Sequence, residues 1–270
     1  MNRQDPVVGH VMTELVDRSI DALRARHDAL ETLISKLTPE ELEARSGASE
    51  WTVAQVLAHL GSGAEIMLST LSEATGVTVA PQDNQDVWDR WNAATSEEQA
   101  SGFVEHDQRL VAALEATTAE QRTSAMVDLG FLPEPVPLVT PVGMRLNEVA
   151  AHGWDVAVAS DPDAGIDTEA ADLLAEHFTG GLGFLLGFAG KADRLSDNTS
   201  IAFADYQLVI DDSVRIIERA DKPATATFSG PLEGVIRLLS GRLKPEHTPA
   251  NIEITGNVTL DDLRKVFPGY

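Results

Sequence analysis

The sequence contains no cysteine. This absence excludes disulfide bonds, thiolate metal sites, iron–sulfur clusters and a cysteine nucleophile. Any thiol chemistry must therefore use a thiol from outside the chain. Long apolar runs are also missing, since no stretch approaches the ~18 uninterrupted apolar residues typical of a membrane span. Residues 1–10 lack the basic start and apolar run of a signal peptide, and we therefore expect a cytoplasmic protein.

Basic residues are few. The 270 residues include 20 Lys+Arg against 43 Asp+Glu, a formal net charge of −23. Nucleic acids and anionic membranes bind to positively charged surfaces, so we expect neither as a partner. A cation or a small ligand fits this charge better. Hydrophobic residues make up 43% of the chain, enough for one large or two ordinary globular domains. The sequence leaves open whether the protein is a monomer or a homodimer.

Apolar residues recur every three or four positions up to about residue 190, which predicts a helical bundle over 1–190. One long amphipathic helix is expected over Val8–Leu37. Pairs of the capping-box type, which mark helix starts, are Thr52 with Gln55, Ser96 with Gln99, and Thr118 with Gln121. Four prolines predict an extended loop over Leu132–Val139, followed by helices from Thr140 to about Ser160 and from Thr168 to about Phe188. We expect the glycines at positions 180, 181, 183 and 187 to interrupt or loosen the second of these helices.

The pattern changes after Gly190 to short β-branched or alternating runs separated by turns, which predict strands. We expect a small α+β domain over 195–270. Its predicted elements are strands at Ser200–Ala204, Tyr206–Ile210, Val214–Arg219, Ala224–Phe228 and Asn251–Thr255, and helices at Leu232–Leu239 and Thr259–Val266.

Three residues of the helix after the proline loop form a candidate metal-binding group. Glu148 and His152 are four residues apart and Asp155 is three further on, so all three share one helical face. A carboxylate and an imidazole at this spacing can hold one divalent ion, and His59 from a facing helix would complete a His₂Glu set with an open position. An open position is typical of a catalytic metal.

The spacing alone leaves other interpretations open. Glu-x-x-x-His on a helix is also a common surface ion pair. His59, between Ala58 and Leu60, is compatible with a half-buried histidine bonded to a carbonyl group. The other five histidines are interpreted as structural or solvent-exposed.

The resemblance of two segments to a known protein family favours the metal-binding interpretation of these residues. The segment Glu50–Leu60, with Trp51, Thr52, Val53 and His59, is similar to the signature of DinB-like four-helix-bundle proteins. Within that group it resembles the mycothiol-dependent maleylpyruvate isomerase family of actinobacteria. The resemblance implies that His59, Glu148 and His152 hold a divalent metal, most simply zinc. The segment Asn147–Ala157 resembles the family's E-x-x-x-H-x-x-D helix, which implies that Asp155 lies close to the bound thiol cofactor, mycothiol.

The C-terminal region resembles the family's sterol-carrier-like α+β domain, which contributes an arginine to the site. The chain departs from the family here, because Ile236 stands in a segment where a tryptophan is usual. Arg237 and Arg242 are therefore both candidates for binding a substrate carboxylate. They lie on different helical faces, and we favour Arg242.

The resulting hypothesis is an enzyme in which the metal holds the sulfur of a low-molecular-weight thiol as a nucleophile. The resemblance implies that this thiol is mycothiol. The substrate would be a small electrophile. The thiol could add and leave again, giving an isomerase, or stay attached, giving an S-transferase. The alternative is a non-catalytic metal-binding or small-ligand-binding sensor protein of the same fold.

Overall fold

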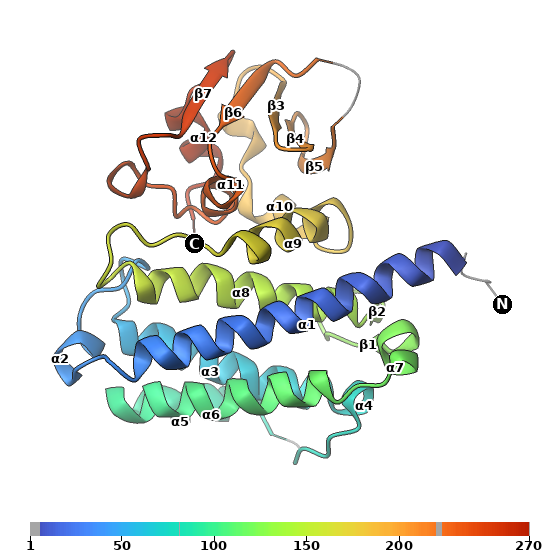
Figure 1. Ribbon diagram of the computed structural model, residues 1–270, viewed down its shortest axis with the longest axis vertical. Helices are drawn as coiled ribbons and strands as arrows, with labels where there is room; N and C mark the ends of the chain where they lie inside the picture. The colour runs from blue at the N-terminus through green and yellow to red at the C-terminus, as the bar shows by residue number, and fades with distance from the viewer. Residues whose placement is uncertain (1–5, 81, 220–222, 270) are drawn as a thin grey trace. The chain divides into compact units, whose positions relative to one another are not determined.

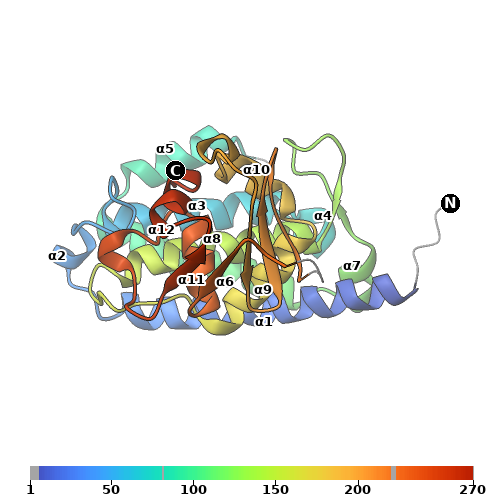
Figure 2. The same ribbon diagram turned by 90° about the horizontal axis from the view of Figure 1, so that it is seen from above.

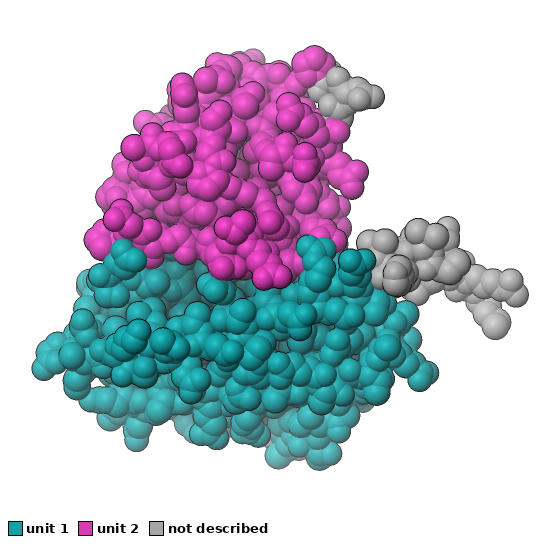
Figure 3. All heavy atoms as spheres, in the orientation of Figure 1, with its two compact units in different colours: residues 1–161 teal, residues 162–270 magenta. Residues whose placement is uncertain are grey.

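The computed structural model describes residues 6–80, 82–219 and 223–269 and divides into two compact units, 1–161 and 162–270 (Figure 3). The first unit is built almost entirely of helices. Its elements are α1 (Pro6–Ile34), α2 (Pro39–Leu42), α3 (Val53–Thr70), α4 (Ser72–Thr75), α5 (Asn84–Ala93), α6 (Ser96–Glu115), α7 (Ala119–Ser124), β1 (Met126–Val127), β2 (Val136–Pro137) and α8 (Val139–Ala157).

Four long helices, α1, α3, α6 and α8, form the predicted bundle (Figure 1). α3 packs on α6 and α8, and α1 packs on the other sides of the same two helices. Figure 2 shows α1 running along the length of this bundle. The core is made by the predicted apolar stripes, and includes Val16, Ile20, Leu23, Leu57, Leu60, Phe103, Leu110, Leu146 and Val149.

Capping boxes fix where several helices of the bundle begin. Thr52 caps α3 with Gln55, and Thr118 caps α7 with Gln121, as predicted. The box predicted at Ser96 is wrong by one residue, because Thr95 caps α6 and pairs with Glu98. The two boxes overlap in sequence, and the cap falls on Thr95 because its backbone is extended, with φ −69° and ψ 162°.

The proline-containing segment is more ordered than predicted. Met126–Val127 and Val136–Pro137 pair as a two-stranded antiparallel ribbon, which leads directly into α8. The ten-residue helix α5 was not predicted, because its polar sequence has few apolar positions. Val87 and Trp91 alone are its buried residues.

The second unit contains a five-stranded sheet with short helices. Its elements are α9 (Thr168–Thr179), α10 (Gly183–Ala189), η1 (Ala192–Arg194), β3 (Thr199–Phe203), β4 (Tyr206–Ile210), β5 (Val214–Glu218), β6 (Ala226–Ser229), α11 (Leu232–Leu239), η2 (Pro245–His247), β7 (Glu253–Gly256) and α12 (Leu260–Val266). The strand order is β5-β4-β3-β6-β7, with β3 and β6 parallel and the other pairs antiparallel. The predicted α+β character of this region is confirmed.

The division by packing differs from the predicted domains 1–190 and 195–270. α9 and α10 pack against β5, and α9 also packs against α11, so both helices belong to the second unit. The interruption predicted at the glycines within residues 168–188 is confirmed, because α9 ends at Gly180 and α10 begins at Gly183. The spacing of apolar residues identifies a helix, but it does not show which hydrophobic core the apolar face of that helix joins. The predicted boundary near residue 190 therefore differs from the observed division after residue 161.

Candidate metal centre

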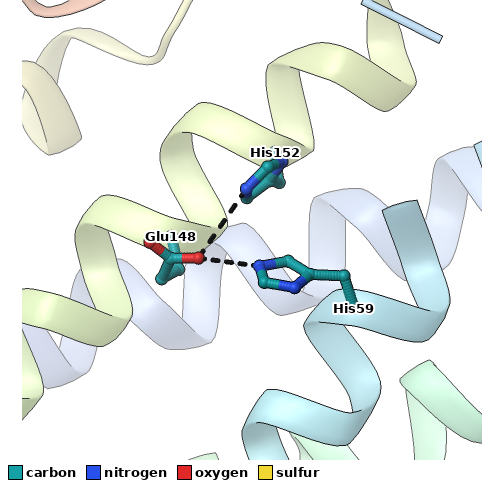
Figure 4. A group of neighbouring side chains, drawn as sticks. All are labelled: His59, Glu148 and His152. Atoms are coloured by element: carbon teal, nitrogen blue, oxygen red, sulfur yellow. Dashed lines mark hydrogen bonds and ion pairs between the residues drawn. The ribbon is translucent and has the colours of Figure 1, made fainter. Parts of the chain in front are cut away.

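α3 and α8 bring three predicted ligands together. Thr52 starts α3, so His59 lies in its second turn, and Glu148 and His152 lie one turn apart on α8. One ligand atom from each of the three residues lies within 4.8 Å of the other two (Figure 4). The two helices are packed together in the bundle, so the site is built on rigid elements.

The distances between donor atoms suit one metal ion. Glu148 Oε2 is 2.9 Å from His59 Nε2 and 3.7 Å from His152 Nε2. Donors about 2.0–2.1 Å from a tetrahedral zinc ion are separated by roughly 3.4 Å, which lies between these two values. Two imidazole nitrogens and one carboxylate oxygen are also a donor set that zinc and similar divalent ions accept. The residues present therefore fit the metal that the resemblance implies.

Glu148 is the anionic member of the group. Burial by itself raises the pKa of its carboxyl group, but the hydrogen bond with His59 and the charges of His152, His59 and Arg145 lower the pKa to about 2. Glu148 is therefore a carboxylate at neutral pH. Its side chain is 42% exposed and that of His59 is 40% exposed, so a ligand from solution can reach this side of the group.

Asp155 lies behind the ligands rather than among them. Its Oδ2 is 2.9 Å from His152 Nδ1, and its side chain is fully buried. The predicted place of Asp155 close to a bound thiol cofactor stays a prediction. Donation from Nδ1 to Asp155 leaves His152 Nε2 as an acceptor facing Glu148, which is the tautomer a metal ligand needs.

A buried charged layer lies beneath the site and was not predicted. Arg145, one turn before Glu148, donates to Asp107 over 2.6 Å, and Asp107 also pairs with His27 at 2.8 Å. All three side chains are nearly inaccessible to solvent. Arg145 Nε is buried and has no hydrogen-bond partner among the described residues. The sequence signal was a lone arginine on the buried face of α8, between the apolar neighbours Met144 and Leu146.

The two candidate arginines lie in the second unit. Arg237 is 2% exposed and holds both carboxylate oxygens of Glu233, with Nε and Nη2 at 2.6 and 2.9 Å, and it also donates to the carbonyl oxygen of His247. These contacts give Arg237 a structural role. Arg242 is buried to a smaller extent, at 8% exposed, and donates to the Ser240 carbonyl oxygen. Its role toward a substrate stays a prediction.

Comparisons with known proteins agree with this description. The sequence profile of the mycothiol maleylpyruvate isomerase N-terminal domain matches residues 23–157, which contain His59, Glu148, His152 and Asp155. The chain belongs to this family. The predicted family is thus confirmed.

Two solved structures share the fold of the whole chain. A crystal structure of the mycothiol-dependent maleylpyruvate isomerase is 18% identical with a TM-score of 0.60, and one of a histidine-to-alanine mutant is 17% identical with a TM-score of 0.61. Each match covers 90% of this chain and 94% of the other. The bundle followed by a small sheet domain is therefore confirmed as the fold of this family member. A comparison with curated proteins finds no match. Among the described residues, no helix is both long and apolar enough to cross a membrane.

Proposed function

We propose that the protein is a metal-dependent enzyme that uses mycothiol, or a similar low-molecular-weight thiol, as a nucleophile toward a small electrophile. The observation that carries this proposal is the convergence of His59, Glu148 and His152 within one coordination sphere. Membership of a family named for a mycothiol isomerase supports the thiol, and the cysteine-free sequence is compatible with a thiol supplied from outside.

The residues of this chain have separate roles in that chemistry. His59 and His152 supply imidazole nitrogens, and Glu148 supplies a negative charge that persists at neutral pH. Asp155 fixes the ring of His152 from behind. A divalent ion, when bound by these groups, lowers the pKa of a coordinated thiol so that the thiol reacts as an anion at neutral pH.

The reaction class is addition of the thiol sulfur to an activated carbon of the electrophile. Loss of the thiol after rotation about the former double bond gives cis–trans isomerisation. Retention of the new carbon–sulfur bond gives S-transfer. The open face at His59 and Glu148 suits either outcome, and an arginine such as Arg242 would bind an anionic group of the substrate.

The test begins with metal analysis of protein purified without chelators. We expect about one divalent ion per chain and turnover of a small electrophile that requires both metal and thiol. Mycothiol should be compared with other thiols. His152→Ala should abolish metal binding and turnover, whereas His106→Ala removes a histidine outside the group and serves as the matched control.

Two results would contradict the proposal in different ways. Metal bound and retained without any thiol-dependent turnover would favour a non-catalytic binding or sensor protein. Turnover at equal, metal-independent rates with every thiol, unchanged in His152→Ala, would show that this site does not perform the reaction.

A further inference from the structure

The indole of Trp51 lies against both candidate histidine ligands. Its ring centroid is 5.2 Å from that of His59 and 5.9 Å from that of His152, and the two imidazoles are 4.6 Å apart. Trp51 is 37% exposed. Part of the indole therefore covers the imidazoles while the rest faces solvent.

The two histidines differ in how their outer nitrogens are held. His152 Nδ1 is hydrogen-bonded to the buried carboxyl group of Asp155. His59 bonds Glu148 through Nε2, and within residues 6–80, 82–219 and 223–269 its Nδ1 has no hydrogen-bond partner. Metal-ligating histidines usually have a partner for the second ring nitrogen, which fixes the ring orientation. On the outer side of His59, the contact with Trp51 takes the place of such a partner.

The loop before α3 holds Trp51 in position. The Trp51 N–H donates to the Ala48 carbonyl oxygen over 2.8 Å, and the Trp51 carbonyl oxygen accepts from the Ser46 N–H and hydroxyl over 3.0 and 2.9 Å. In the same loop, the Gly47 N–H donates to the carbonyl oxygen of Asp155 over 2.8 Å. The loop that carries Trp51 is therefore attached to α8 at the residue that also orients His152.

We propose that Trp51 is a positioning residue of the metal centre. Its indole holds the imidazole of His59 so that Nε2 faces Glu148. A histidine side chain that is already held in place loses less rotational freedom when it binds a metal. This inference rests on the proposed function, because it assigns Trp51 a role toward a bound ion.

The first experiment measures metal affinity by competition between the full-length protein and a chromophoric chelator for Co²⁺. Trp51→Ala should bind Co²⁺ about 10-fold more weakly than the wild type, whereas Trp51→Phe, which keeps an aromatic ring, should stay within about 2-fold. Trp88→Ala is the matched control, since Trp88 lies on α5, is 44% exposed and should leave the affinity unchanged. Equal affinity of Trp51→Ala and Trp88→Ala would overturn the proposal.

The second experiment uses metal-free protein and thereby separates this inference from the proposed function. The ring proton resonances of His59 and His152, assigned with His59→Ala and His152→Ala, should carry a ring-current shift from the indole. Trp51→Ala should remove that shift and Trp88→Ala should not. A wild-type protein that binds no metal would contradict the proposed function alone. Unchanged histidine resonances in Trp51→Ala would contradict the role of Trp51 whether or not metal binds.

Discussion

His152 and Asp155 lie one turn apart on α8 and are joined by a 2.9 Å hydrogen bond between Nδ1 and Oδ2. The bond orients the second nitrogen of the ring, Nε2, toward Glu148, and the burial of Asp155 keeps water from competing for it. In the proposed metal site, the aspartate would act on the metal through the histidine.

We predict that Asp155→Ala weakens metal affinity about 10- to 100-fold, the usual effect of removing the outer partner of a histidine ligand. Asp155→Asn should have a smaller effect, because its amide oxygen can still accept from Nδ1. The measurement is chelator competition at neutral pH. Asp86→Asn, at an exposed position on α5, serves as the control for a lost carboxylate. An Asp155→Ala protein with wild-type metal affinity would contradict this action of Asp155 through His152.

The sequence could predict that the three candidate ligands lie together because each position depends on local pattern. Glu148 and His152 share a face by helical spacing, and the capping box at Thr52 fixes the turn of α3 that carries His59. The sequence could not predict that the side chain of Asp155 is buried. A residue three positions from His152 shares its face only approximately, and the neighbouring loop decides what covers it.

Contacts between distant segments could not be predicted from the sequence either, because local patterns do not show which segments pack together. The pairing of His27, Asp107 and Arg145 joins α1, α6 and α8, and no local period indicates which polar residues of three helices will meet. The contact of the Trp51 indole with both histidine rings likewise depends on how the loop before α3 folds onto α8.

Gly47 should be intolerant of substitution. A Cβ at this position would lie 2.8 Å from Val158 Cγ1 and 2.9 Å from both Asp155 Oδ1 and Trp154 Cζ3, which is closer than real Cβ atoms approach. We predict that Gly47→Ala shifts the loop, costs about 1–3 kcal/mol of unfolding free energy, and weakens metal affinity. Gly187→Ala is the control, because its Cβ would meet no atom within 4 Å. Urea unfolding of both variants measures the cost, and equal stabilities would show that the loop has room to move.

The buried ion pair of Arg145 and Asp107 should matter for folding. Both side chains are almost completely buried, and loss of one partner leaves the other charge uncompensated. We predict that Arg145→Met lowers the unfolding free energy by about 3–5 kcal/mol. The double variant Arg145→Met/Asp107→Leu should recover a large part of this loss, since it removes both charges. Equal destabilisation by the single and double variants would show that packing, not charge, sets the cost.

Asp107 should also make stability depend on pH in the acid range. Burial alone raises the pKa of its carboxyl group, but the charge of Arg145 and the hydrogen bonds from His27 and Arg145 outweigh burial and lower the pKa below its usual 3.8. The stabilisation is therefore complete above the unfolded value near pH 4 and is lost as the pH falls through the lower folded value. The difference in unfolding free energy between wild type and Asp107→Asn should narrow from pH 5 to pH 3. If the difference in unfolding free energy stays constant from pH 5 to pH 3, the pKa of Asp107 is not lowered in the folded protein.

The two arginines of the second unit are expected to have different roles. We expect Arg237 to contribute to the stability of the fold and Arg242 to substrate binding. Arg237 binds Glu233 through two nitrogens and also the His247 carbonyl oxygen, so Arg237→Met should lower stability markedly, by about 3–5 kcal/mol. The Arg242 guanidinium donates to the Ser240 carbonyl oxygen. If Arg242 binds an anionic group of the substrate, Arg242→Met should raise KM for an anionic electrophile at least 10-fold, while KM for a neutral analogue changes little. Steady-state kinetics with the matched pair of electrophiles measures this. Because a lost carboxylate contact can affect only the anionic substrate, an equal rise in KM for both electrophiles would remove Arg242 from the substrate site.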